Sequence, residues 1–282
     1  MFLAGIKKEL RLFTRGFRLW GILLTVVGIA LMYPGMYKLI EVMAEMLKQL
    51  DVSMGEGVTQ DAANSMLEML NSIAALYGGE LISVGFYTGI LSFTTEGFLI
   101  AALLLMATAG GEQKKRSIIM PNCAGLTPAG YVIPKFVLYP LLIGTISFLG
   151  CLLTAFLSQL MFGGALATST VMIGSACISI YMVFMTAVYF LFGIATGRPG
   201  VGVVVMYLGA SLLPTLLEAF KINKYSPFAL RDMFMKSVSE LDMSEFWLSV
   251  MVTVVLSVIC CLATLVVVTL RRVDNTSGEA NL

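Results

Sequence analysis

Long stretches without a charged residue alternate with short charged segments along this chain. The apolar stretches are 19–37, 81–111, 136–197, 199–217 and 246–270. The second is interrupted by Glu96 alone. Because one membrane crossing takes about 20 residues, the charge-free stretch 136–197 holds two helices with a turn near Gly163-Gly164. The pattern therefore predicts six membrane-spanning helices.

The composition leads to the same class of protein. Hydrophobic residues make up 58% of the chain and charged residues only 12%, whereas soluble domains carry about 25% charged residues. We therefore expect an all-α polytopic membrane protein with one transmembrane domain over 19–270.

Lysine and arginine are unevenly divided between the two sides that six crossings define. With the N-terminus inside, twelve of the 18 basic residues are cytoplasmic: Lys7, Lys8, Arg11, Arg15, Arg18, Lys114, Lys115, Arg116, Lys135, Arg198, Arg271 and Arg272. Acidic residues concentrate on the other side. The positive-inside rule thus predicts that both termini are cytoplasmic, with 271–282 as a cytoplasmic tail.

Residues 1–18 have the period of an amphipathic helix. At about 100° per residue, the apolar side chains fall in one arc, and the basic ones lie opposite. The apolar set is Phe2, Leu3, Ile6, Leu10, Phe13 and Phe17. This pattern is typical of a helix in the membrane interface whose basic face meets anionic headgroups. A signal peptide is the alternative, but its charged region would be unusually long and no convincing cleavage site follows.

Two longer segments lie outside the membrane in this topology. Segment 38–80 is acidic and has apolar residues at helical spacing on both sides of Gly55-Glu56-Gly57, so we predict a helical hairpin with packed methionine-rich faces. A substrate-binding lid is the alternative. Segment 218–245 is mixed in charge and is expected to approach the membrane again near Pro227.

Several kinds of chemistry are excluded by the residues present. Histidine does not occur, which removes His-dependent catalysis and HExxH metal sites. The dipeptide Gly-Lys does not occur either, so the chain lacks a phosphate-binding loop. Its five cysteines have no metal-ligand spacing and are expected to be small apolar core residues. We expect no catalytic, cofactor-binding or metal-binding residue in this chain.

The charged segment GEQKKRSIIMPNCAGLTPAGYVIPK, 111–135, interrupts very apolar sequence. Topology explains its basic residues, but not a connection of about 20 residues where a two-residue turn would serve. The segment resembles the coupling element between spans two and three in permease subunits of type-2 ABC exporters. The matching residues are Glu112, Arg116, Ser117, Pro121, Thr127, Pro128, Tyr131 and Lys135. Segment 223–231, NKYSPFALR, is similar to that family's segment after span five, although Asn and Pro are separated here.

The resemblance implies a six-span permease whose element 111–130 docks on a separate cytoplasmic ABC ATPase subunit. ATP and Mg would be bound by that subunit, and a second permease copy or a paralogue would complete the complex in a bacterial plasma membrane. Membrane lipid is a further partner, and no nucleic acid is expected. The docking residues would be Glu112, Lys115, Arg116, Ser117, Ile118, Pro121 and Arg198.

Two sets of polar residues lie within predicted spans. They are Thr88, Ser92, Thr95 and Glu96 in span two, and Ser211, Thr215 and Glu218 in span five. Each set shares a helical face, and polar groups inside a membrane are expected to face protein or water. They could line the outer half of a pathway between two permease copies. Alternatively, both glutamates bond neighbouring helices or reach the outer surface.

The sequence thus predicts an exporter permease for an amphipathic or hydrophobic substrate, such as a peptide, drug or lipid-like molecule. A secondary transporter or channel that uses Glu96 needs no motor and is the main alternative, although such proteins often show internal repeats. A membrane-embedded enzyme and an anchor that recruits an ATPase are further alternatives.

Overall fold

The computed structural model describes residues 2–54, 57–77, 80–111, 127–234 and 242–279. Every regular element within these residues is helical. They are α1 (Phe2–Arg15), α2 (Phe17–Met54), α3 (Gly57–Leu76), α4 (Leu81–Ser92), η1 (Phe93–Gly97), α5 (Phe98–Leu104), η2 (Ala107–Gly111), α8 (Pro128–Phe162), α9 (Thr168–Thr196), α10 (Pro199–Ala219), η3 (Asn223–Tyr225), α11 (Ala229–Met233) and α12 (Met243–Glu279).

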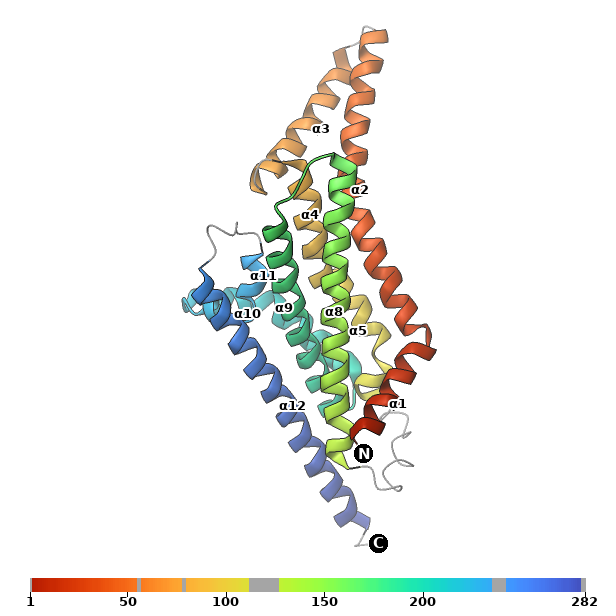
Figure 1. The fold of residues 1–282 in the computed structure, drawn as a ribbon, viewed down its shortest axis with the longest axis vertical. Coiled ribbons are helices and arrows are strands. Elements are labelled where there is room, and N and C mark those ends of the chain that lie inside the picture. The colour runs from red at the N-terminus through yellow and green to blue at the C-terminus, as the bar shows by residue number, and fades with distance from the viewer. Residues whose placement is uncertain (1, 55–56, 78–79, 112–126, 235–241, 280–282) are drawn as a thin grey trace.

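Six helical segments of the described chain are long and apolar enough to cross a membrane, which confirms the predicted fold class. They are Phe17–Gln49, Leu81–Leu104, Pro128–Phe162, Thr168–Thr196, Pro199–Ala219 and Met243–Arg271. The helix α1 and the last turns of α12 lie at one end of the elongated molecule, opposite the α2–α3 hairpin (Figure 1). We call these the basal end and the hairpin end.

The helix α9 forms the centre of the bundle. It packs against α8, α10 and α12, and 67% of the residues in its most apolar stretch are buried. The rings of Tyr139 and Phe190 stack at 5.3 Å between α8 and α9. At the basal end, Gly193 of α9 lies so close to η2 that an added Cβ would be 2.5 Å from the Ala109 carbonyl oxygen. Only glycine fits at this position, and its lack of a side chain lets η2 pack directly against α9.

The hairpin forms as predicted in outline, but its seam differs from expectation. The first arm is a direct continuation of the span through Pro34. Met43, Met46 and Met69 are exposed, whereas Ala44 and Ala63 are fully buried. The apolar cluster between the arms contains Leu70 and Ala74 of α3 and Tyr37 of α2, with Ile40 and Leu67 packed against them, so methionines do not dominate this contact. The expected methionine packing is therefore wrong.

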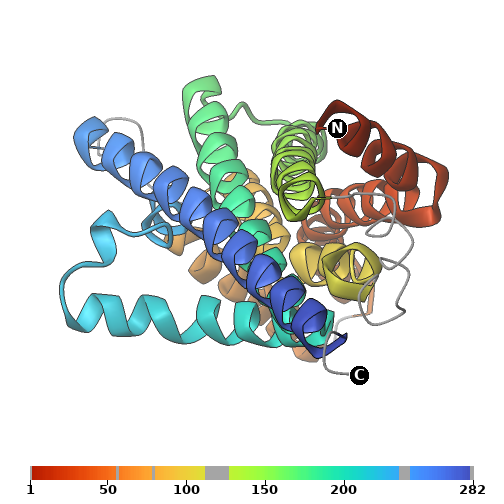
Figure 2. The ribbon, with the colours of Figure 1, turned by 90° about the horizontal axis from the view of Figure 1, so that it is seen from below.

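The helices α10 and α12 are the least enclosed of the six. Most of their apolar surface is exposed. Viewed from the basal end, α10 is seen side-on while α8 is seen along its axis, so α10 is steeply inclined to α8 (Figure 2). Apolar surface of this extent faces either lipid or another chain.

Candidate functional site

The predicted docking residues fall mostly outside the described part of the chain. Glu112, Lys115, Arg116, Ser117, Ile118 and Pro121 belong to segment 112–126, which is not among the described residues. The segment leaves from η2 and returns to α8. The residues on both sides of it are described, and they make an unusual contact with each other.

A buried lysine joins the two sides of segment 112–126. Lys135 of α8 is fully buried, and its Nζ donates a hydrogen bond of 2.9 Å to the carbonyl oxygen of Thr108 in η2. The same ammonium group lies 4.5 Å from the ring centroid of Tyr131, one turn earlier in α8, within the range of a cation–π contact. The chain therefore leaves and re-enters the bundle at two points that are held together.

The counter-ion of Lys135 comes from the N-terminal helix. Glu9 of α1 is only 3% exposed, its Oε1 lies 3.7 Å from Lys135 Nζ, and its Oε2 accepts a hydrogen bond of 2.9 Å from Tyr139 Oη. A buried ion pair is tolerated only when its remaining groups are also satisfied, and Tyr139 and Thr108 provide this. We call Glu9, Lys135, Tyr139 and Thr108 the basal cluster.

The basal cluster docks α1 against α8. Phe13 is buried with its ring edge-on to Tyr139, at a centroid distance of 5.9 Å, and Gly5 lies against Pro134. Leu3 and Phe17 remain exposed. The predicted apolar arc of α1 is thus divided between protein contact and exposed surface, so α1 is a docked helix as well as an amphipathic one.

Sequence reasoning missed the basal cluster, although one signal was present. The sequence pattern identifies Lys135 as a basic residue at the end of the charged segment, and it gives Glu9 no partner. On the helical wheel, however, Glu9 falls on the side opposite the basic residues, one turn before Phe13. Its pairing with Lys135 spans 126 residues of sequence and could not be read from local spacing.

Arg198 lies in the predicted tight turn at the basal end. The helix α9 ends at Gly197 in a left-handed conformation, and α10 begins with Pro199 directly after Arg198. The Arg198 side chain is exposed, while its N–H donates to Thr196 Oγ1 at 3.2 Å. A docking role for Arg198 stays a prediction.

The span-two residues lie on both sides of the start of a π-helical turn, η1, which holds Thr95 and Glu96. Ser92 is buried and donates to the Thr88 carbonyl oxygen at 2.9 Å, whereas Glu96 is exposed. The two side chains therefore differ in burial. A pathway role for the shared face of these residues stays a prediction.

The partners of Glu96 are hydroxyl groups. Tyr33 Oη of α2 donates to its Oε1 at 3.4 Å, and the neighbouring Thr95 Oγ1 donates to its Oε2. Among the described residues no cation forms an ion pair with it; the carboxylates that do pair are Glu9, Glu41 and Glu245. Glu96 is thus a carboxylate within a membrane-length helix that is held by neutral groups.

The helix that carries the span-five residues packs on different elements from those that surround η1. Ser211, Thr215 and Glu218 are exposed on α10, which packs mainly on α9, whereas η1 lies beside α2, α4 and α5. Glu218 lines an open pocket of about 420 Å³ together with Lys221, Lys224, Asp232 and Glu245. This group therefore belongs to a charged surface near η3 and α11.

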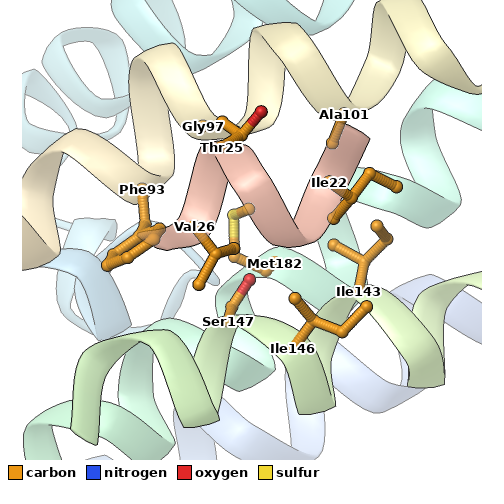
Figure 3. Close-up of a pocket in the computed structure, with 10 residues that line it drawn as sticks. All are labelled: Ile22, Thr25, Val26, Phe93, Gly97, Ala101, Ile143, Ile146, Ser147 and Met182. Atoms are coloured by element: carbon orange, nitrogen blue, oxygen red, sulfur yellow. The ribbon is translucent and has the colours of Figure 1, made fainter. Parts of the chain in front are cut away.

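An enclosed cavity lies in the middle of the bundle, between α2, η1, α5, α8 and α9. It has a volume of about 20 Å³, and apolar side chains surround Thr25 and Ser147 (Figure 3). A cavity of this size holds about one water molecule. It is too small for a transported substrate.

Within the described residues, no group of three or more Cys, Asp or Glu side chains is placed to hold a metal ion. Comparison with protein-family models, with curated proteins and with solved structures gave no match to this chain.

Proposed function

We propose that this chain is the permease subunit of an ABC exporter. It would move an amphipathic or hydrophobic substrate across a bacterial plasma membrane, while a separate cytoplasmic subunit binds Mg and hydrolyses ATP. The permease itself would form no covalent intermediate. Six membrane-length helices, an amphipathic N-terminal helix and the charged segment after span two support this proposal.

The observation that carries the proposal is the bond from Lys135 to the Thr108 carbonyl oxygen. Because this bond joins η2 to α8, a force on segment 112–126 would reach spans two and three as a unit. Through Glu9 the same force would reach α1. A connection that serves only as a loop needs no such buried joint at its base.

A second copy or a paralogue would complete the permease. The exposed apolar surfaces of α10 and α12 are suited to such a partner, and Glu96 with Thr88 and Thr95 would face a pathway between two copies. Since the cavity in the middle of the bundle is too small for a substrate, a pathway between chains is the more suitable place for one.

A specific observation favours a second candidate, a motor-independent secondary transporter. Glu96 is exposed and bonded to hydroxyl groups, so it could take up and release a proton or cation. In that case, replacing Glu96 would abolish transport, and no ATPase subunit would accompany the chain.

Co-purification from the native cell distinguishes the two candidates. The tagged chain is extracted in mild detergent, and the bound proteins are identified by mass spectrometry. We expect a subunit with a nucleotide-binding loop, retained by the wild type and lost from the Glu112→Ala/Arg116→Ala variant. The matched control is Lys221→Ala/Lys224→Ala in the predicted outer segment 218–245, which should retain it. Absence of any ATPase after cross-linking would favour the secondary transporter.

A further inference from the structure

An apolar groove runs between α1 and the exposed side of α8. It has a volume of about 220 Å³ and is lined by Ile6 of α1 and by Val137, Leu138, Leu141, Thr145 and Ile146 of α8. The hydroxyl of Thr145 is bonded to the Leu141 carbonyl oxygen at 2.8 Å, which leaves the Thr145 methyl group to the groove. The lining is thus almost entirely hydrocarbon.

A basic cleft lies on the same helix, next to the groove in sequence. It has a volume of about 600 Å³, and its charged lining consists of Lys7, Lys8, Arg11, Arg15 and Arg18. No acidic residue is among the described residues that line it. Apart from a 3.9 Å contact between Lys8 and Glu9, no ion pair to these five side chains is found in the described part of the chain.

One of these cations, Arg18, has a guanidinium nitrogen without a hydrogen-bond partner. The atom, Nη1, is buried, and no described residue accepts a hydrogen bond from it. A buried guanidinium nitrogen without a partner is unfavourable, and phosphate oxygens are among the strongest acceptors for this group. The exposed side chains of Lys7, Lys8, Arg11 and Arg15 give the cleft the charge and the accessible donors for a phosphate.

We propose that the groove and the basic cleft together hold one anionic glycerophospholipid. An acyl chain lies along α8 in the groove, and the phosphodiester lies on the basic face of α1. Ile6 lines the groove and Lys7 lines the cleft, so a single molecule can reach both. The hydrocarbon lining selects a lipid over free phosphate, and the five cations select an anionic headgroup over a zwitterionic one.

The basal cluster makes this site rigid. Because Glu9 and Phe13 fix α1 on α8, the groove exists before the lipid binds, and its walls do not depend on the lipid. The bound lipid would then hold α1 from its exposed side. This site goes beyond the permease proposal, since it requires neither an ATPase nor a substrate.

Native mass spectrometry of the delipidated full-length protein in detergent tests the site. The protein is titrated with phosphatidylglycerol and with phosphatidylcholine that carry identical acyl chains. We expect one tightly retained phosphatidylglycerol, bound at least about ten-fold more strongly than phosphatidylcholine because two or more cations contribute. Excess inorganic phosphate should not displace it. Equal binding of the two lipids, or displacement by phosphate, would overturn the proposal.

Matched variants separate the headgroup site from the groove. Lys7→Gln/Arg11→Gln should weaken phosphatidylglycerol binding by about five-fold for each charge removed, and Lys7→Arg/Arg11→Lys should retain it. Lys221→Gln/Lys224→Gln in the predicted outer segment 218–245 is the charge control. Leu141→Trp fills the groove and should weaken both lipids, whereas Leu149→Trp, two turns further along the exposed side of α8, should not. If both Trp variants weaken lipid binding equally, the acyl chain does not occupy a defined site in the groove. Gel filtration and circular dichroism establish that each variant is folded.

Discussion

Two glutamates of this chain lie in or beside membrane-length helices, and their surroundings are opposite. Glu9 is buried, paired with Lys135 and hydrogen-bonded by Tyr139. Glu96 is exposed and has hydroxyl partners from Tyr33 and Thr95. The first carboxylate is satisfied within its own chain. The second has bonding capacity left for something outside the chain, whether water, a second copy or a transported molecule.

The comparison separates a structural charge from a candidate functional one. A charge that is buried with its counter-ion fixes the position of the helices that carry it, and removing one partner leaves the other unpaired. An exposed charge contributes little to stability, so its presence in a span needs another reason. Glu9 therefore explains the architecture of the basal end, and Glu96 is the better candidate for transport.

The largest effect is expected from Lys135→Met. The variant removes the buried partner of Glu9 and leaves only the half-exposed Lys8 at 3.9 Å, which should lower the free energy of unfolding by about 3 kcal/mol. Unfolding in mixed detergent micelles, followed by circular dichroism, measures the change. The double variant Glu9→Met/Lys135→Met removes both charges and should recover most of the loss. A double variant as unstable as the sum of its two single variants would show that the pair is not coupled.

A smaller effect is expected from Tyr139→Phe. This change removes one hydrogen bond to a charged group, for which the loss is about 1.5–3 kcal/mol, and it keeps the stacking on Phe190. The same unfolding measurement applies. Tyr189→Phe is a suitable control for a buried tyrosine, since Tyr189 donates to the neutral Ala102 carbonyl oxygen. A Tyr139→Phe variant less affected than the control would contradict the special role of Glu9.

The smallest effect on stability is expected from Glu96→Gln. Because Glu96 is exposed and lacks a cationic partner among the described residues, the free energy of unfolding should change by less than about 0.5 kcal/mol. A decrease in the free energy of unfolding as large as that of a Glu9 variant would show that both carboxylates stabilise the fold.

Thiol labelling sharpens the same distinction. In a background without the native cysteines, Glu96→Cys should react with a membrane-impermeant thiol reagent added from outside the cell, because a pathway residue meets water. Ser92→Cys should stay unreactive, since Ser92 is buried in its own chain. If Glu96→Cys also stays unreactive in every nucleotide state, Glu96 faces lipid or a dry helix contact and lines no pathway.

The sequence was sufficient for the fold class because apolar length alone defines membrane-spanning helices. It located all six helices and the hairpin between the first two. It could not tell which apolar side chains of the hairpin are buried, because exposed methionines and buried alanines lie on the same helices. The sequence pattern also did not reveal the π-helical turn at Phe93–Gly97.

The candidate site was predictable only where local spacing sufficed. The charged segment and Arg198 stand out along the chain, but the joint at the base of the segment depends on partners from α1, η2 and α8. Such a contact between distant residues is a property of the tertiary packing. The lipid groove likewise arises only after α1 has docked on α8.

We propose that segment 112–126 receives force from an ATP-hydrolysing partner. The most direct measurement places a photo-activated cross-linking amino acid at Ile118, with Ile222 in the predicted outer segment 218–245 as the control position. We expect position 118 to form a covalent adduct with a chain that carries a nucleotide-binding loop, and position 222 to form none. An ATPase that co-purifies but reacts from position 222 and never from 118 would contradict a docking role for the segment.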